Sequence, residues 1–159
     1  MAGPATTPRI EDLLPMREEV FLLCLGFSRN AAVAEDLCQD VYLKAFRKLD
    51  SVRHPEAVRF WLLRLARNVC RDHYRRSRLV GFDPLDSRAD LAAASNGGVP
   101  DDFEDRLVRL KSSVEVLPQK LREVFILRTY ARLSYEDVAR TLRIKEGTVM
   151  SRLYRARAA

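Results

Sequence analysis

The sequence of 159 residues has few of the features that mark exported, membrane-bound or disulfide-stabilised proteins. No apolar run approaches the roughly 20 residues that span a bilayer, and the N-terminus lacks the apolar core of a signal peptide. Cysteine occurs three times, at Cys24, Cys38 and Cys70, never as CxxC and each time within an apolar helical pattern. We therefore expect buried thiols in a reducing cytoplasm, without a disulfide framework and without direct membrane insertion.

Sequence signatures of catalysis are missing as well. The P-loop, HExxH and GxSxG motifs do not occur. Four side chains of the metal-binding types are Cys38, His54, Cys70 and His73. Among them, just Cys70 and His73 lie close in sequence, at one three-residue spacing, and ordinary core or surface roles explain all four more simply. We expect no enzymatic activity, no metal site and no cofactor.

Positive charge and helical periodicity are what the chain does contain. Its net charge is +6 and its pI about 9.5, a moderate positive field that attracts polyanions. With 47% hydrophobic residues it can bury one medium core or two small ones. Apolar residues recur at helical spacing almost throughout, and strand-like alternation never persists. These patterns predict an all-α fold.

One break divides the helical pattern. Residues 81–102 collect glycine, proline, serine and aspartate, and their aspartates outnumber the lone Arg88, so the segment is typical of a flexible acidic linker. The prediction is therefore two small helical domains, 9–79 and 103–159, joined by a flexible linker over 80–102. The expected helices cover residues 10–27, 31–49 and 58–78, with a turn or loop at 51–57, and Pro15 shortening the first helix.

The second domain is expected to begin with a helix through Leu107 to Leu117. Pro118 is well placed as the first residue of the next helix, whose inward residues are Leu121, Val124, Phe125 and Leu127. Two further helices then complete a four-helix domain.

Residues 134–157, SYEDVARTLRIKEGTVMSRLYRAR, have the pattern of a helix-turn-helix. Ser134 and Asp137 form a capping-box pattern that opens the first helix, and Gly147 can lead the backbone into the second. The inward residues recur at four-residue spacing: Val138, Leu142, Val149 and Leu153. The opposite face of the second helix carries Ser151, Arg152 and Arg155, where a DNA major groove would lie. The pattern predicts a reader of duplex DNA, and the alternative is a helical hairpin with a solvated basic face.

The segment FWLLRLARNVCRDHYRRSR carries a second basic pattern. Its arginines follow steps of three and four residues, and we call them the arginine stripe: Arg64, Arg67, Arg71, Arg75 and Arg78. The same segment contains just one acidic residue, Asp72. Such a row, about 20 Å long, matches a run of backbone phosphates. Phe60, Trp61 and Tyr74 could stack on unpaired bases, although a solvated basic face with core aromatics explains the pattern too.

The preceding helix has the opposite charge on its exposed side. Its polar residues cluster within about one and a half turns: Glu35, Asp36, Gln39 and Asp40. An acidic patch on a basic protein does not face DNA, so it favours a protein partner with a basic surface. The alternative is a solvated face with favourable charge near a helix N-terminus.

Four segments in this order resemble the extracytoplasmic-function (ECF) class of sigma-70-family factors. They are AEDLCQDVYLKAF, FWLLRLARNVCRDHYRR, LPQKLREVFILR and LSYEDVARTLRIKEGTVMSRLYRAR. The resemblance covers about residues 10–79 and 104–158. It implies a promoter-specificity subunit of RNA polymerase with sigma region 2 at 9–79 and sigma region 4 at 103–159. An anti-sigma factor that holds the two domains until a signal arrives is also implied.

The resemblance assigns roles to individual residues. Asp36, Gln39 and Asp40 match the surface that docks on the clamp helices of the largest polymerase subunit, and region 4 is expected at the flap of the second largest. The residues expected to bind the −10 element, partly as single-stranded DNA, are Arg53, His54, Trp61, Arg64, Arg67, Asn68, Arg71 and Arg75. The residues expected to bind the −35 duplex are Thr148, Ser151, Arg152 and Arg155.

Three positions depart from the family pattern. Leu62 stands where housekeeping sigma factors carry a second strand-opening aromatic beside Trp61, which implies weaker melting. Met150 replaces a frequent lysine or arginine, and Arg143 a frequent glycine of the turn. The main alternative function is a conventional helix-turn-helix regulator with a helical sensing or dimerisation domain, which would need neither the acidic patch nor the arginine stripe.

Overall fold

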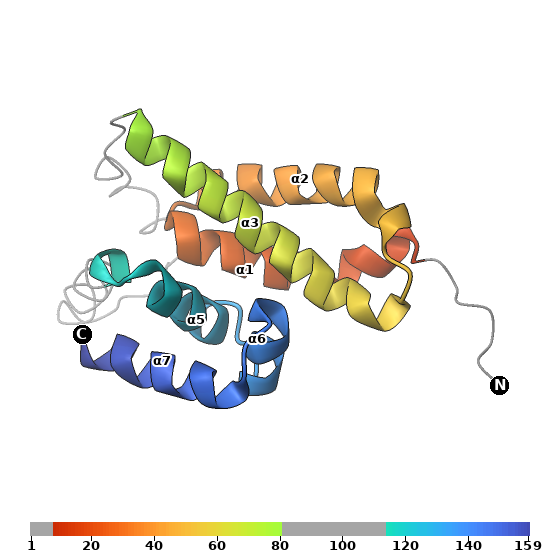
Figure 1. Cartoon of the computed structure of the whole chain (residues 1–159). Coiled ribbons are helices and arrows are strands. Elements are labelled where there is room, and N and C mark those ends of the chain that lie inside the picture. The colour runs from red at the N-terminus through yellow and green to blue at the C-terminus, as the bar shows by residue number, and fades with distance from the viewer. Residues whose placement is uncertain (1–7, 81–113) are drawn as a thin grey trace, which may run out of the picture.

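The computed structural model describes residues 8–80, here called the N-terminal region, and 114–159, the C-terminal region (Figure 1). Within these ranges the chain is helical and contains no strand, as predicted. The α-helices are α1 (Arg17–Ser28), α2 (Ala31–Lys48), α3 (Val58–Leu79), α5 (Gln119–Thr129), α6 (Tyr135–Leu142) and α7 (Glu146–Ala158). Three short 3-10 helices are η1 (Ile10–Met16), η2 (Leu49–Ser51) and η3 (Pro55–Ala57). The predicted linker after Val80 and the predicted helix up to residue 113 lie outside the described residues.

Local chemistry explains the boundaries in the N-terminal region. Pro15 lies inside η1, so the expected first helix starts as a tighter turn and becomes α-helical at Arg17. Asn30 caps α2, because its Oδ1 accepts a hydrogen bond from the Val33 amide at 3.0 Å. The predicted turn at 51–57 contains the end of η2, an extended stretch and η3. α3 follows directly.

The helix-turn-helix begins as predicted, but its turn differs. Ser134 Oγ accepts a hydrogen bond from the Asp137 amide at 3.0 Å. Arg143, with φ 54° and ψ 46°, ends α6 in the left-handed conformation. α7 begins at Glu146, so Gly147 is already helical, and its expected role in leading the chain into the helix is wrong. Pro118 (ψ 143°) was predicted to be the first residue of the next helix, but it lies just before that helix. α5 begins at Gln119, one residue later than predicted.

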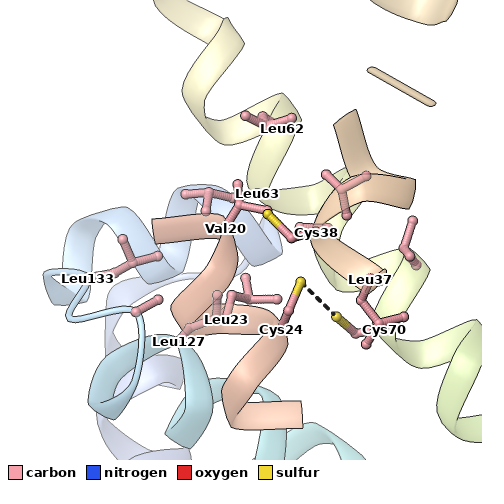
Figure 2. Packing of buried hydrophobic residues seen from close by; sticks show 14 of the residues in the cluster. Val20, Leu23, Cys24, Leu37, Cys38, Leu62, Leu63, Cys70, Leu127 and Leu133 are labelled. Atoms are coloured by element: carbon pink, nitrogen blue, oxygen red, sulfur yellow. Dashed lines mark hydrogen bonds between the residues drawn. The ribbon is translucent and has the colours of Figure 1, made fainter. Parts of the chain in front are cut away.

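A buried apolar cluster joins the two regions. In Figure 2, Leu127 and Leu133 of the C-terminal region lie beside Val20 and Leu23 of α1, and all four are at most 1% exposed. Gly26 makes this approach possible: a Cβ atom there would lie 2.6 Å from Cγ2 of Ile126. α5 and α6 therefore pack on the N-terminal region, and α7 lies at the outer edge of the molecule (Figure 1).

The three cysteines are buried free thiols, as predicted. Cys24 and Cys70 are in contact, with 3.7 Å between their sulfur atoms (Figure 2). Desolvation raises the pKa of Cys38 to about 11, and the hydrogen bond with Cys24, together with burial, raises the pKa of Cys70. The raised pKa values keep Cys38 and Cys70 protonated, and all three buried thiols pack as small apolar side chains. No helix among the described residues is long and apolar enough to cross a membrane.

Candidate nucleic-acid interface

The arginine stripe runs along α3, and its first three members contact the C-terminal region. Arg64 donates a hydrogen bond from Nη1 to the Arg140 carbonyl oxygen at 3.3 Å. Arg67 donates from Nε to Oε2 of Glu123 at 2.9 Å, and Arg71 Nε lies 3.4 Å from Oε1 of the same carboxylate. Burial, followed by the charge of Arg143, lowers the pKa of Arg64. Part of the predicted phosphate-binding face, at Arg64 and Arg67, thus faces protein, whereas Arg71, Arg75 and Arg78 are exposed.

Glu123 on α5 is the centre of this contact. It is 4% exposed, and besides Arg67 and Arg71 it accepts a hydrogen bond from Gln119 at 3.0 Å. A buried carboxylate must be paired, because leaving it alone in the interior costs several kcal/mol. Sequence reasoning missed Glu123, although it precedes the inward Leu127 by four residues and so shares its helix face.

Aromatic rings of α3 lie in the same interface. The Phe60 ring has the guanidinium groups of Arg59 and Arg140 each 5.5 Å from its centroid. Tyr74 is contacted similarly by Arg122 of α5 at 4.8 Å and by Arg78 at 5.6 Å. Each ring therefore contacts one guanidinium group from each region. The negative face of an aromatic ring attracts such cations, so these contacts stabilise the interface.

Arg59, which the sequence did not single out, connects three helices. It binds Glu19 of α1 through two hydrogen bonds, with Nη2 to Oε1 at 2.6 Å, and its Nη1 lies 3.1 Å from Asp137 of α6. The hydrogen bond to Glu19 is the largest cause that raises the pKa of Arg59, opposed by desolvation and aided by Asp137. This group fixes α6 against the start of α3.

Other predicted −10 residues remain near the surface. Arg53 and His54 are exposed before η3, and His54 Nδ1 lies 3.5 Å from a Glu56 carboxylate oxygen. Asn68 is exposed on α3, and Arg75 pairs with Asp72 at 2.9 Å. Trp61 is half-buried against the core, whereas the neighbouring Leu62 is fully buried. The structure thus does not gather all predicted −10 residues on one open surface.

α7 presents an open face. Val149 and Leu153 are buried, as predicted, while Ser151 and Arg155 are exposed and Thr148 and Arg152 are half-buried. Two large exposed side chains that sequence reasoning did not assign to the site share this surface, Met150 (50% exposed) and Tyr154 (76%). The four-residue spacing of Met150 and Tyr154, which places both on one helix face, was the available signal.

α2 presents a second open face. Asp36, Gln39 and Asp40 are exposed, and Leu43 (55% exposed) continues their row by one further turn. Phe46 is also exposed there, at 42%. Apolar residues beside an acidic patch are typical of a protein-binding surface. Sequence reasoning missed both, although Leu43 follows Gln39 by four residues and Phe46 follows Leu43 by three, a spacing that places them on the same helix face as the acidic patch.

Comparisons with known proteins agree with this geometry. The family described as "Sigma-70 region 2" matches residues 16–80, and "Sigma-70, region 4" matches 107–159. RNA polymerase sigma-H factor of Pseudomonas aeruginosa is 30% identical, over 95% of this chain and 84% of its own. ECF RNA polymerase sigma factor EcfG of Rhodopseudomonas palustris is 31% identical, over 97% and 83%.

A solved structure is similar over both regions. The sigma factor RpoE of Bartonella quintana, crystallised with the anti-sigma factor NepR, matches with a TM-score of 0.66 and 28% identity, over 93% of this chain and 91% of that one. The chain belongs to the ECF class of the sigma-70 family of RNA polymerase sigma factors. The predicted family and the predicted fold are confirmed, and the conventional-regulator alternative is set aside.

Proposed function

We propose that this sigma factor binds core RNA polymerase through α2, recognises a −35 duplex through α7, and engages a −10 element through α3 and the loop before it. The observation that carries the proposal is the open face of α7: Ser151 and Arg155 are exposed directly opposite the buried Val149 and Leu153. A rigidly packed helix with polar and basic groups on its free side is what major-groove recognition requires.

For the polymerase contact we propose the acidic face of α2, Asp36, Gln39 and Asp40, extended by Leu43. The support is the exposure of all four side chains and the combination of negative charge with an apolar centre. Such a surface complements basic, partly apolar helices, and the clamp helices of the largest subunit are the proposed partner. The flap of the second largest subunit is the proposed partner of the C-terminal region.

For the −10 element we propose Arg53, His54 and Asn68, which are exposed, together with Trp61 and the arginine stripe. Phosphate contacts by the arginines would position a strand, and a base released from the stack could enter beside the loop. Trp61 without an aromatic partner at Leu62 supplies less wedge for strand opening.

We also propose control by an anti-sigma factor in the cytoplasm. The support is that RpoE of Bartonella quintana, similar over nearly the whole chain, was crystallised with such a partner.

Run-off transcription tests the proposal directly. Purified protein is added to core polymerase on a pool of genomic promoter fragments, and RNA 5′ ends are sequenced. We expect initiation from a small set of promoters that share −10 and −35 sequences. Tight duplex binding by the protein alone, without promoter-dependent initiation, would contradict the proposal.

Variants separate the surfaces. Asp36→Ala, Gln39→Ala and Asp40→Ala together should abolish association with core polymerase while the far-UV circular dichroism and the melting temperature stay unchanged. Glu18→Ala, which removes an exposed acid from α1, is the matched control and should bind normally. Retained affinity in the triple variant would assign the polymerase contact elsewhere.

A further inference from the structure

The exposed face of α7 contains two large apolar side chains beside its polar and basic ones. Met150 is 50% exposed, and Tyr154, four residues further along, is 76% exposed. The core contacts of α7 are made by Val149, Leu153 and Ala156, which are at most 8% exposed. The helix is therefore packed without Met150 and Tyr154, and both side chains are available to a binding partner.

Met150 lies in the part of α7 that a recognition helix places closest to the bases. α7 begins at Glu146, so Met150 is just over one turn from the N-terminal end, whereas Tyr154 is a further turn away. Residues near the N-terminus of a recognition helix contact base edges in the major groove. Of the two apolar side chains, Met150 is thus the one placed to reach a base.

The chemistry of methionine limits what this side chain can recognise in a DNA duplex. A thioether carries no charge and no hydrogen-bond donor, so it does not bind phosphate. The major-groove edges of the base pairs present donors, acceptors and a single apolar group, which is the C5 methyl group of thymine. The flexible, polarisable side chain of methionine adapts well to a contact of this kind.

The neighbouring Ser151 restricts how a thymine could be recognised here. Its hydroxyl group donates a hydrogen bond to the carbonyl oxygen of Thr148, 3.1 Å away. With its proton used in this way, the hydroxyl oxygen can accept from an amino group of adenine or cytosine, but it does not donate to O4 of thymine. A thymine beside Ser151 is therefore recognised through its methyl group.

We propose that Met150 is a specificity-determining residue of the −35 site and contacts the C5 methyl group of a thymine. This inference rests on the −35 role of α7 proposed above and names the base that this side chain selects. The −35 element of this sigma factor accordingly contains at least one A·T pair opposite Met150.

Deoxyuridine tests this contact, because it lacks only the methyl group of thymidine and forms the same base pair. A promoter fragment from the run-off experiment is prepared with deoxyuridine at one −35 thymine at a time, on either strand. Its affinity for the reconstituted holoenzyme is measured in competition with the unmodified fragment. We expect a loss of about fourfold at one position, which corresponds to the burial of one methyl group.

Two variants identify Met150 as the residue that reads the methyl group. Met150→Ala should reduce the deoxyuridine loss to less than about twofold, because its side chain is too short to bury the methyl group. Met150→Lys should also lose the discrimination. In addition, it should steepen the dependence of log affinity on log salt concentration by about 0.9, the value for one added phosphate contact.

Leu14→Ala is the matched control, since it shortens an exposed apolar side chain of the N-terminal region, and it should keep the fourfold loss. No loss with deoxyuridine at any −35 thymine would overturn the inference, as would a −35 element of G·C pairs alone. An equal loss in the wild type and in Met150→Ala would assign the methyl contact to another residue and overturn it too. Unchanged salt dependence in Met150→Lys, with the discrimination retained, would place residue 150 away from the DNA.

The run-off experiment separates these outcomes from a failure of the proposed function. Promoter-dependent initiation, with binding that responds to base changes in the −35 element but not to deoxyuridine, refutes the thymine contact and leaves the sigma function standing. Absence of initiation by the wild-type protein refutes the proposed function itself, and the thymine contact with it.

Discussion

α3 and α7 are both basic amphipathic helices, yet they differ in how far their polar faces are exposed to solvent. Arginines of α3 meet Glu123 and backbone of the C-terminal region, while α7 keeps Ser151 and Arg155 at the surface. The difference comes from the neighbouring helix α5, whose buried Glu123 pairs with arginines of α3. Within residues 8–80 and 114–159, no such acid covers the exposed face of α7. Positive charge on a helix therefore indicates a capacity for DNA, and its surroundings decide whether that capacity is available.

The largest expected effect comes from weakening the buried apolar cluster that joins the two regions. Leu127 is fully buried in the cluster shared by both regions, so Leu127→Ala should lower the free energy of unfolding by about 2–5 kcal/mol. Leu43→Ala on the exposed face of α2 is the control, with a change within about 0.5 kcal/mol. Urea unfolding measures both. Similar small losses in the two variants would mean that Leu127 is not packed as described.

A smaller effect with an unusual sign is expected at Gly26. Alanine in place of glycine inside a helix ordinarily stabilises by roughly 0.5–1 kcal/mol. At Gly26 the added methyl group meets Ile126, so Gly26→Ala should instead destabilise by about 1–3 kcal/mol. Gly147→Ala in α7, where nothing lies within 4 Å of the added atom, should show the ordinary gain. Thermal unfolding of both variants gives the comparison, and a gain at both positions would refute the close approach.

The open face of α7 can be tested separately from the covered face of α3. If Arg152 reads a base, Arg152→Ala should weaken use of the −35 element by about 1–3 kcal/mol, with core polymerase binding unchanged. Lys48→Ala, which removes an exposed cation at the end of α2, is the control. Promoter-fragment binding by the reconstituted holoenzyme measures the effect. An equal loss in both variants would indicate general electrostatics and no base contact.

The smallest expected effect concerns the turn that positions α7. Arg143 has φ 54°, a conformation in which a side chain costs about 1–2 kcal/mol and glycine nothing. After the greater freedom of glycine in the unfolded chain is subtracted, Arg143→Gly should stabilise by roughly 0.5–1 kcal/mol. Arg155→Gly, inside α7, should destabilise by about 1 kcal/mol. Differential scanning calorimetry distinguishes these opposite signs, and two losses would contradict the assigned turn.

The sequence allowed the helices to be predicted closely, because periodicity and capping are local. α2 and α3 begin at the predicted residues, and Ser134 caps α6 as expected. The errors at Pro118 and Gly147 have a local cause too. Proline and glycine can stand just outside a helix or in its first turn, so the sequence does not fix the boundary to a single residue.

The interface between the regions could not be predicted in this way. Glu123, Arg59 and Gly26 each have an ordinary local interpretation, as a helix-surface acid, a helix-start cation and a mid-helix glycine. Their roles depend on residues far away in the chain, such as Arg67 for Glu123 and Ile126 for Gly26. Pairing of this kind is a tertiary property that periodicity does not encode.

The burial of all three thiols has a practical consequence for studying motion between the regions. Because Cys24, Cys38 and Cys70 are at most 2% exposed, maleimide dyes should not react with them in the folded protein. A cysteine introduced on each of two exposed helices then provides a site-specific pair of labels in an otherwise native background. Fluorescence energy transfer can thus follow the protein, molecule by molecule, without prior removal of its own cysteines.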